Sequence, residues 1–140
     1  MRVIAEGATL VDSVRAVRVL ETSHPPVYFV PPSDIVTDRL MLSERLSFCE
    51  WKGRAEYFDL RLIEGRALPS VAFSYPEPSA RFEGYAGWLS FYAGSLVIDN
   101  GDGCFVGEER VAPQPGGFYS GWITRAYAGP FKGVPGSAGW

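Results

Sequence analysis

Apolar side chains in the first hundred residues recur at alternate positions, and glycine or proline interrupts this pattern at short intervals. Such alternation is typical of strands, in which successive side chains point to opposite faces. In residues 57–62, Phe58, Leu60 and Leu62 share one face and Tyr57 lies on the other, which predicts that the first face is core. Similar patterns predict further strands at residues 2–6, 17–22, 27–30, 39–46, 71–75, 88–92 and 96–99.

Helix is expected only as single turns. Ser33 follows Pro32 and can cap one turn, and residues 78–83 predict a second turn that ends at Gly84. No segment shows the longer apolar periodicity of an amphipathic helix. The predicted fold class is therefore all-β, with short helical turns.

The composition predicts one globular domain over residues 1–140. Of the 140 residues, 46% are hydrophobic and 21% are charged, which suffices for a full core without a disulfide or a metal. A net charge of -3 argues against nucleic acid or an anionic membrane as a partner. No apolar stretch approaches the roughly 20 residues of a membrane span, so we expect a cytoplasmic protein.

The last forty residues have a different character. Residues 1–100 hold 6 glycines, whereas residues 101–140 hold 10, which is typical of loops. Yet this stretch is also rich in aromatic rings, among them Phe118, Tyr119, Trp122, Phe131 and Trp140, too many for a solvated linker. We therefore expect a β core at 1–112 and an ordered tail at 113–140 that its rings attach to the core.

Cysteine and histidine are too few for a metal centre. Cys49 and Cys104 form no Cys-x-x-Cys pair, and we expect both to be reduced thiols. With His24 they make three scattered ligand candidates, whereas tetrahedral zinc usually takes four. His24 precedes Pro25-Pro26 in a predicted turn, where we expect it to be exposed. The sequence thus predicts neither a metal nor a cofactor.

Lysine use is the sharpest internal signal. The chain has 11 arginines but only two lysines, and both occur as aromatic-Lys-Gly, in Trp51-Lys52-Gly53 and Phe131-Lys132-Gly133. Lysine is a compact cation on a flexible stem, so it suits a nucleophile or a narrow pocket where arginine does not. The alternative is a turn that lets each ammonium extend to water from an apolar surface. The role of Lys132 is left open.

Three other residues are candidates for chemistry. Cys49 near Lys52 is either a reactive thiol or a small buried hydrophobic residue. Glu77 stands between Pro76 and Pro78, which hold its backbone rigid, so it can pair with Lys52 or meet a ligand. Asp59 is a further carboxylate for acid/base chemistry.

Several motifs together resemble a family of small bacterial and fungal proteins, domain of unknown function 427. They are Trp51-Lys52-Gly53 within residues 48–53, Tyr75-Pro76-Glu77-Pro78, Gly84-Tyr85 with Phe91-Tyr92, and residues 18–22, 25–29 and 129–140. The resemblance implies a β-tent architecture, two antiparallel sheets that meet at an angle without the cysteine knuckles of related zinc-binding folds. The family is also labelled nucleotidyltransferase-like. Nucleotidyl transfer normally needs metal-bound carboxylates, and no closely spaced aspartate pair is present.

The leading hypothesis is a small-molecule-binding domain. Its pocket would be lined by aromatic residues and anchored by Lys52 and Glu77, which we expect to share one cleft. The expected aromatic residues are Trp51, Tyr57, Tyr75, Trp88 and Tyr92.

Two alternatives remain. One is an enzyme that uses Lys52 or Cys49 as nucleophile with Glu77 or Asp59 as acid/base. The other is a protein-interaction module that uses the aromatic tail. The sequence fixes neither the ligand nor the oligomeric state.

Overall fold

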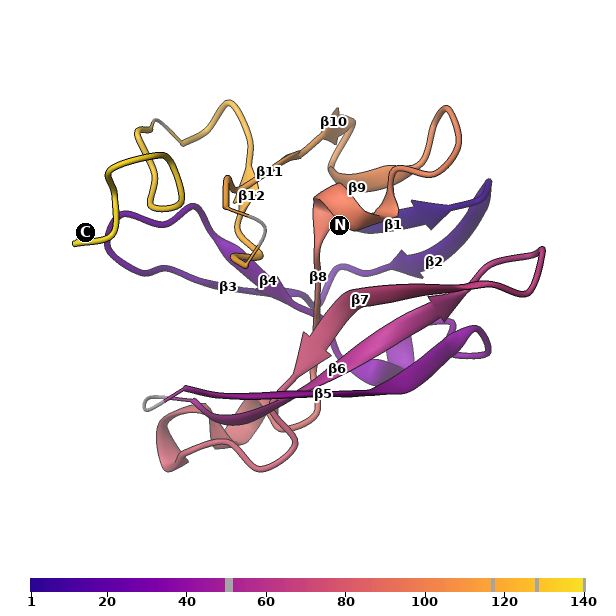
Figure 1. Cartoon of the computed structure of the whole chain (residues 1–140), viewed down its shortest axis with the longest axis horizontal. Coiled ribbons are helices and arrows are strands. Elements are labelled where there is room, and N and C mark those ends of the chain that lie inside the picture. Colours follow the sequence, from indigo (N-terminus) through magenta and orange to yellow (C-terminus); the bar gives the residue numbers. More distant parts are fainter. Residues whose placement is uncertain (50–51, 117, 128, 140) are drawn as a thin grey trace.

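The computed structural model describes residues 1–49, 52–116, 118–127 and 129–139 (Figure 1). In these residues the chain is mainly β, as predicted, and its strands pair antiparallel. One four-stranded sheet has the order β10-β9-β1-β2. Its strands are β1 (Arg2–Ala5), β2 (Ala8–Asp12), β9 (Gly103–Val106) and β10 (Glu109–Arg110).

The second four-stranded sheet follows chain order, β5-β6-β7-β8. Its strands are β5 (Leu40–Cys49), β6 (Gly53–Arg61), β7 (Ala67–Ser74) and β8 (Leu89–Phe91). Two smaller sheets accompany the two expected ones in the described residues. They pair β3 (Val17–Val19) with β4 (Val27–Phe29), and β11 (Ala112–Pro113) with β12 (Trp122–Ile123).

Helix is limited to 3-10 turns in the described part of the chain: η1 (Pro32–Asp34), η2 (Ala80–Tyr85) and η3 (Ala93–Leu96). The first two confirm the predicted turns, with corrections. Ser33 makes no capping hydrogen bond, because Pro31 occupies the cap position, and η2 runs through Gly84 to Tyr85. None of the helices described is long and apolar enough to cross a membrane.

The strand prediction fails at residues 96–99. Leu96 ends the turn η3 and is fully buried, and no strand follows before β9. Strands β2 and β9 were missed, since neither shows the alternation used for the others. They form because β1 pairs with both of them, with Val3 opposite Val11 on one side and Cys104 on the other.

Two hydrophobic clusters lie among the described residues. The larger one includes Val3, Leu60, Val71, Phe91 and Trp122, and it contains the predicted core face of β6 through Leu60 and Leu62. The smaller one is built on the other face of the same sheet, from Phe29, Ala55, Tyr57, Phe73 and Tyr92. Tyr57 is therefore buried on one face of β6, while Phe58 on the other face is partly buried against the larger cluster, and the aromatic residues gather in the second cluster.

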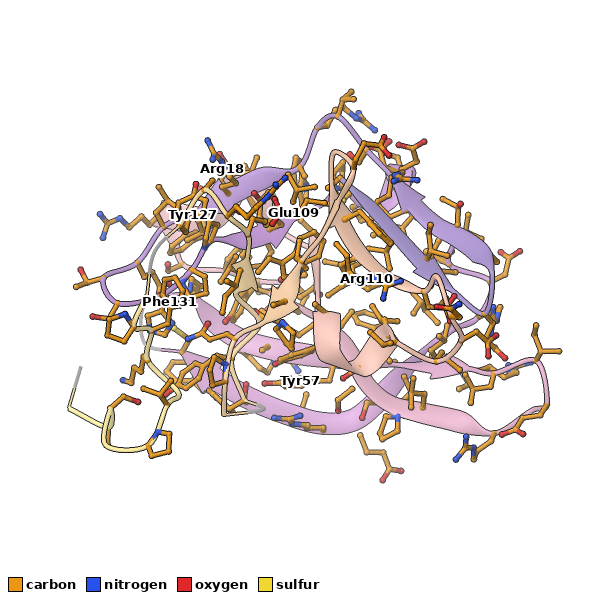
Figure 2. All side chains as sticks on the ribbon, turned by 90° about the horizontal axis from the view of Figure 1, so that it is seen from above. Arg18, Tyr57, Glu109, Arg110, Tyr127 and Phe131 are labelled. Carbon is orange, nitrogen blue, oxygen red and sulfur yellow. The ribbon has the colours of Figure 1, made fainter. Side chains whose placement is uncertain are left out.

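The tail is attached to the core by Trp122, which is fully buried. Its ring stacks on Tyr28 with 4.9 Å between centroids, and its Nε1 donates to the Phe91 carbonyl over 2.9 Å. Further along the tail, the Tyr127 hydroxyl accepts from Arg18 of β3 over 2.7 Å (Figure 2). Phe118, by contrast, is exposed. Trp140 lies outside the described residues.

Candidate functional site

A pocket of about 290 Å³ lies where three parts of the chain meet. The segment that joins β3 to β4 contributes one wall, the aromatic face of the second sheet contributes another, and the tail loop between β11 and β12 contributes the third. The pocket brings together four of the predicted ligand-binding residues, Lys52, Tyr57, Tyr75 and Tyr92, and also Cys49.

The sheet supplies an aromatic wall. Tyr57 of β6 pairs with Phe73 of β7 across the strands, which sets their rings 6.1 Å apart. Phe73 also contacts Tyr75 and Tyr92, each with ring centroids 5.6 Å away. Such offset and edge contacts between rings stabilise the wall beyond the area that they bury. The wall is therefore formed by packed side chains rather than by a flexible loop.

The hydroxyls of Tyr75 and Tyr92 remain protonated near neutral pH. Burial raises the pKa of Tyr75 and Tyr92 above the ordinary value of 10.0, and nearby Tyr57 raises that of Tyr92 further. The Tyr57 hydroxyl lies 2.8 Å from the Ser47 hydroxyl, and the Tyr92 hydroxyl donates to the Phe118 carbonyl over 3.3 Å. The Tyr75 hydroxyl has no such bond within the described residues.

Lys52 is the buried cation of the pocket. Its side chain is 11% exposed, and its ammonium forms an ion pair with Glu21, whose side chain is 44% exposed. Gly53 follows it at a φ of +99°, a backbone conformation that glycine adopts without strain. A side chain at Gly53 would also crowd the Glu77 carbonyl, 3.1 Å away. The turn that presents Lys52 therefore packs on the backbone of 77–79, from which Ser79 N donates to the Lys52 carbonyl.

The expected pairing of Lys52 with Glu77 is wrong. Glu21 takes that place, while the Glu77 side chain is exposed and does not line the pocket. The Pro76-Glu77-Pro78 segment supports the turn through its backbone, while the Glu77 side chain is exposed. Glu21 lies 31 residues from Lys52 in the sequence, and the two meet only because the β3–β4 segment is attached to the second sheet, where Val30 pairs with Leu89 of β8.

Two of the predicted site residues, Asp59 and Trp88, do not line the pocket. Asp59 accepts from the Ser70 amide over 2.8 Å, at the irregularity between β6 and β7, and does not line the pocket. Trp88 packs at the edge of the smaller cluster, edge-on to Tyr85 with 5.3 Å between centroids, and it too lies away from the pocket. Trp51 lies outside the described residues.

Gln114, which the sequence analysis missed, organises the tail side of the pocket. The side chain is buried, and its Oε1 accepts from the Gly121 amide over 3.2 Å. A side chain at Gly121 would overlap Gln114 and Pro25, so the tail closes tightly here. Because Oε1 of Gln114 is the acceptor, its Nε2 is the amide NH₂ group. One Nε2 hydrogen is donated to the Lys132 carbonyl over 2.7 Å and the other to His24 Nδ1 over 3.0 Å.

This network fixes the state of His24. Because Nδ1 accepts a hydrogen bond from Gln114, the imidazole is neutral and carries its proton on Nε2. The ring is half-buried, lines the pocket and stands edge-on to Tyr119 with 5.2 Å between centroids. The expectation of an exposed turn histidine is wrong, since the tail covers this turn.

The two cysteines differ in setting. Cys49 at the end of β5 is half-buried and lines the pocket. Cys104 belongs to the larger cluster, where burial raises the pKa of its thiol. Within the described residues, no three histidine, cysteine or acidic side chains gather as a metal site would require.

Fold and pocket together define a mainly β protein with an aromatic, lysine-containing cavity. A family model described as "Domain of unknown function (DUF427)" matches residues 1–107, and the chain belongs to this family. The name of that model denotes a nucleotidyltransferase. No curated protein matches the chain. The matched residues include Lys52, Tyr57, Tyr75 and Tyr92 but end before the tail, which contributes Gln114 and Tyr119.

Proposed function

We propose that this protein binds a small organic molecule in the pocket between the second sheet and the tail. The observation that carries the proposal is a concave site of about 290 Å³ with aromatic walls and a buried lysine. Ligand sites commonly span about 300–1,000 Å³ and combine apolar walls with a few fixed polar groups. The pocket has a size near the lower end of that range, which suits a molecule with one or two rings.

The fixed polar groups support the same proposal. Glu21 orients the Lys52 ammonium, and Gln114 holds the His24 ring. Groups held in place before binding lower the entropy cost of ordering them around a ligand. A purely structural lysine is more simply placed on the surface, where its charge keeps its hydration.

Native mass spectrometry of protein purified without denaturation tests the proposal. We expect a retained small molecule, lost on denaturation. Cys49→Trp should fill the pocket and abolish the retained mass, whereas Val14→Trp at a fully exposed position should keep it. A mass that persists in Cys49→Trp would place the ligand elsewhere. An empty wild type that also shows no saturable binding in a fragment screen would refute the function.

An enzyme with a Cys49 nucleophile is the second candidate. The observation in its favour is that Cys49 and His24, which lie 25 positions apart in the sequence, line one pocket. Against it, Nε2 of His24 already carries a proton and so offers no lone pair to the thiol. The binding function therefore ranks first.

An activated ester tests the enzyme directly. With p-nitrophenyl acetate, a Cys49 thiolate would attack the acyl carbon, form a thioester and release p-nitrophenolate. The enzyme predicts a stoichiometric burst in wild type and in Cys104→Ser, and none in Cys49→Ser. If wild type releases p-nitrophenolate with no larger burst than Cys49→Ser, this candidate is removed.

A further inference from the structure

We infer that the pocket ligand is a small aromatic acid, whose ring lies against the tyrosine wall and whose carboxylate meets Lys52 and His24. This inference rests on the proposed binding function. A buried ligand must supply partners for the hydrogen-bonding groups around it that have none within the protein. The unpaired groups of the pocket therefore indicate the chemistry of the ligand.

The first free donor is Lys52. An ammonium has three hydrogens and no acceptor capacity, and Glu21 is the one acceptor that its Nζ meets within the described residues. The other face of the ammonium contacts the Phe82 ring at 5.7 Å from the centroid. Lys52 therefore retains donor capacity in a site where its side chain is almost removed from water.

The second free donor is His24. Its Nδ1 lone pair is occupied by Gln114, so the ring can only donate, through Nε2–H. No acceptor for Nε2 is present among the described residues. Gln114 also lines the pocket, but both of its Nε2 hydrogens are already in use, and we assign it as a positioning residue that sets the tautomer of His24.

The remaining polar side chains that line the pocket are mostly hydroxyls, which can donate to a ligand as well as accept from it. The Tyr75 hydroxyl stays protonated and is a third donor without a partner in the described part of the chain. One hydrogen bond joins the Ser47 and Tyr57 hydroxyls, so one of these two keeps its hydrogen free. The groups that can only donate, Lys52 and His24, therefore set the requirement for an acceptor-rich ligand, and the hydroxyls can add to it.

The formal charges point the same way. Lys52 is positive, and the Arg45 guanidinium lies 4.1 Å above the centre of the Tyr57 ring, beside the pocket. Glu21 is the single acidic side chain that lines the pocket in the described residues, and it is the more exposed member of its ion pair. Among the described side chains that line the pocket, Lys52 and Glu21 balance each other. The excess is positive and lies at the rim, where Arg45 is joined by Lys132, whose Nζ is 6.0 Å from the centre of the Tyr119 ring, and an anion suits this excess.

Three probes with one ring system separate the charge classes. Isothermal titration compares indole-3-propionate, its neutral primary amide and the cation tryptamine on the full chain. We expect the propionate to bind with a Kd at least tenfold below that of the amide, and tryptamine to bind most weakly. Equal affinity for all three would leave the binding function intact and overturn the acid assignment, and so would a preference for tryptamine.

The two lysines provide matched variants. Lys52→Met should reduce the preference for propionate over its amide to less than threefold. Lys132→Met should change it by less than about twofold, because Lys132 has the same aromatic-Lys-Gly setting but lies at the rim over Tyr119 and does not line the pocket. If Lys52→Met fails to fold because Glu21 loses its partner, the double variant with Glu21→Gln replaces it. An unchanged preference in the Lys52 variant overturns the inference.

The tautomer can be observed directly, since His24 is the only histidine of the chain. In untagged protein labelled with ¹⁵N, the two imidazole nitrogens report which one carries the proton. We expect Nε2–H in wild type, and loss of that fixed tautomer in Gln114→Met with a weaker preference for propionate. A wild-type ring protonated at Nδ1 overturns the inference whatever the probes show. If none of the probes binds, the acid assignment falls, while a ligand retained in native mass spectrometry would still support the pocket.

Discussion

At the scale of single residues, two buried charges are handled in different ways. Lys52 is paired with a half-exposed carboxylate at a pocket, which leaves part of its hydrogen-bonding capacity free. Asp102 is fully buried, and backbone amides satisfy it: it accepts from Glu6 over 2.8 Å, from Gly7 over 3.0 Å and from Asp99 over 2.7 Å. The first arrangement fits the binding function proposed above, and the second fits a role in stability.

Asp102→Ala should lower the free energy of unfolding by roughly 3 kcal/mol at pH 7, because several amides lose a charged acceptor in a buried place. These amides belong to the β1–β2 turn and to the loop before β9, so the carboxylate holds the two segments together. Urea unfolding measures the loss. Asp12→Ala, at an exposed position of β2, is the control and should change stability by less than about 0.5 kcal/mol.

Asp102 also predicts an acid dependence. Burial alone would raise its pKa, but the hydrogen bonds from Gly7, Asp99 and Glu6 outweigh burial and hold the pKa below 3.8. A depressed folded pKa contributes stability above the unfolded value and loses it as the pH falls through the folded one. Between pH 7 and pH 3, wild type should therefore lose more stability than Asp102→Ala. Parallel pH curves for the two proteins would contradict this reading.

At the scale of elements, the short strand β12 has an effect out of proportion to its length. It consists of two residues, yet Trp122 in it is fully buried and bonds to the Phe91 carbonyl and, through its amide, to that of Pro26. The ring of this one residue thus packs on Tyr28 of β4 and donates to β8, which attaches the tail to both strands. The aromatic-rich tail was predictable from its sequence, whereas the choice of Trp122 over the neighbouring rings was not.

Trp122→Ala should destabilise the protein by about 3–5 kcal/mol, the usual cost of truncating a large buried aromatic side chain. Phe118→Ala is the matched control in the same loop, and it should cost less than about 1 kcal/mol because its side chain is exposed. Thermal unfolding by circular dichroism compares the two. Similar melting temperatures for both variants would show that the tail does not depend on Trp122.

At the scale of the whole molecule, we propose that residues 1–140 form one cooperative domain. The larger cluster joins Val3 of β1 to Trp122 of the tail. The pocket is lined both by residues of the first thirty, such as Glu21, and by tail residues, such as Ser120. Both the stability of the domain and its proposed ligand binding should therefore depend on the tail. The family match ends at residue 107, so the tail adds the Gln114 side of the pocket to the part of the chain that the family defines.

Deletion of residues 113–140 tests this directly. We expect calorimetry of the full chain to show one transition, and the truncated chain to melt at a clearly lower temperature, since Trp122 no longer fills the larger cluster. The truncated chain should also lose the retained ligand. An unchanged melting temperature would mean that the tail is a separate unit.

Local sequence patterns predicted β1, β3 to β8 and most of the aromatic wall. Alternation placed Leu60 and Leu62 in the core and predicted β5 to β8, because side-chain direction in a strand depends only on neighbouring positions. Lys52, Tyr57, Tyr75 and Tyr92 were recognised for the same reason, since their flanking residues mark a turn or a strand. The 3-10 turn at 93–96 was missed, because a single turn leaves little periodicity to detect.

Only the tertiary structure decided which side chains meet at the pocket. Gln114 and His24 are separated by 90 positions, and Glu21 and Lys52 by 31, so no local pattern encodes either contact. Each arises because burial leaves polar groups that must find partners, and the partner is whichever group the packed tail or the neighbouring sheet delivers there. The sequence by itself therefore determined an all-β chain with an aromatic face and singled out Lys52, whereas the long-range packing decided that this lysine is buried and that Glu21, rather than Glu77, pairs with it.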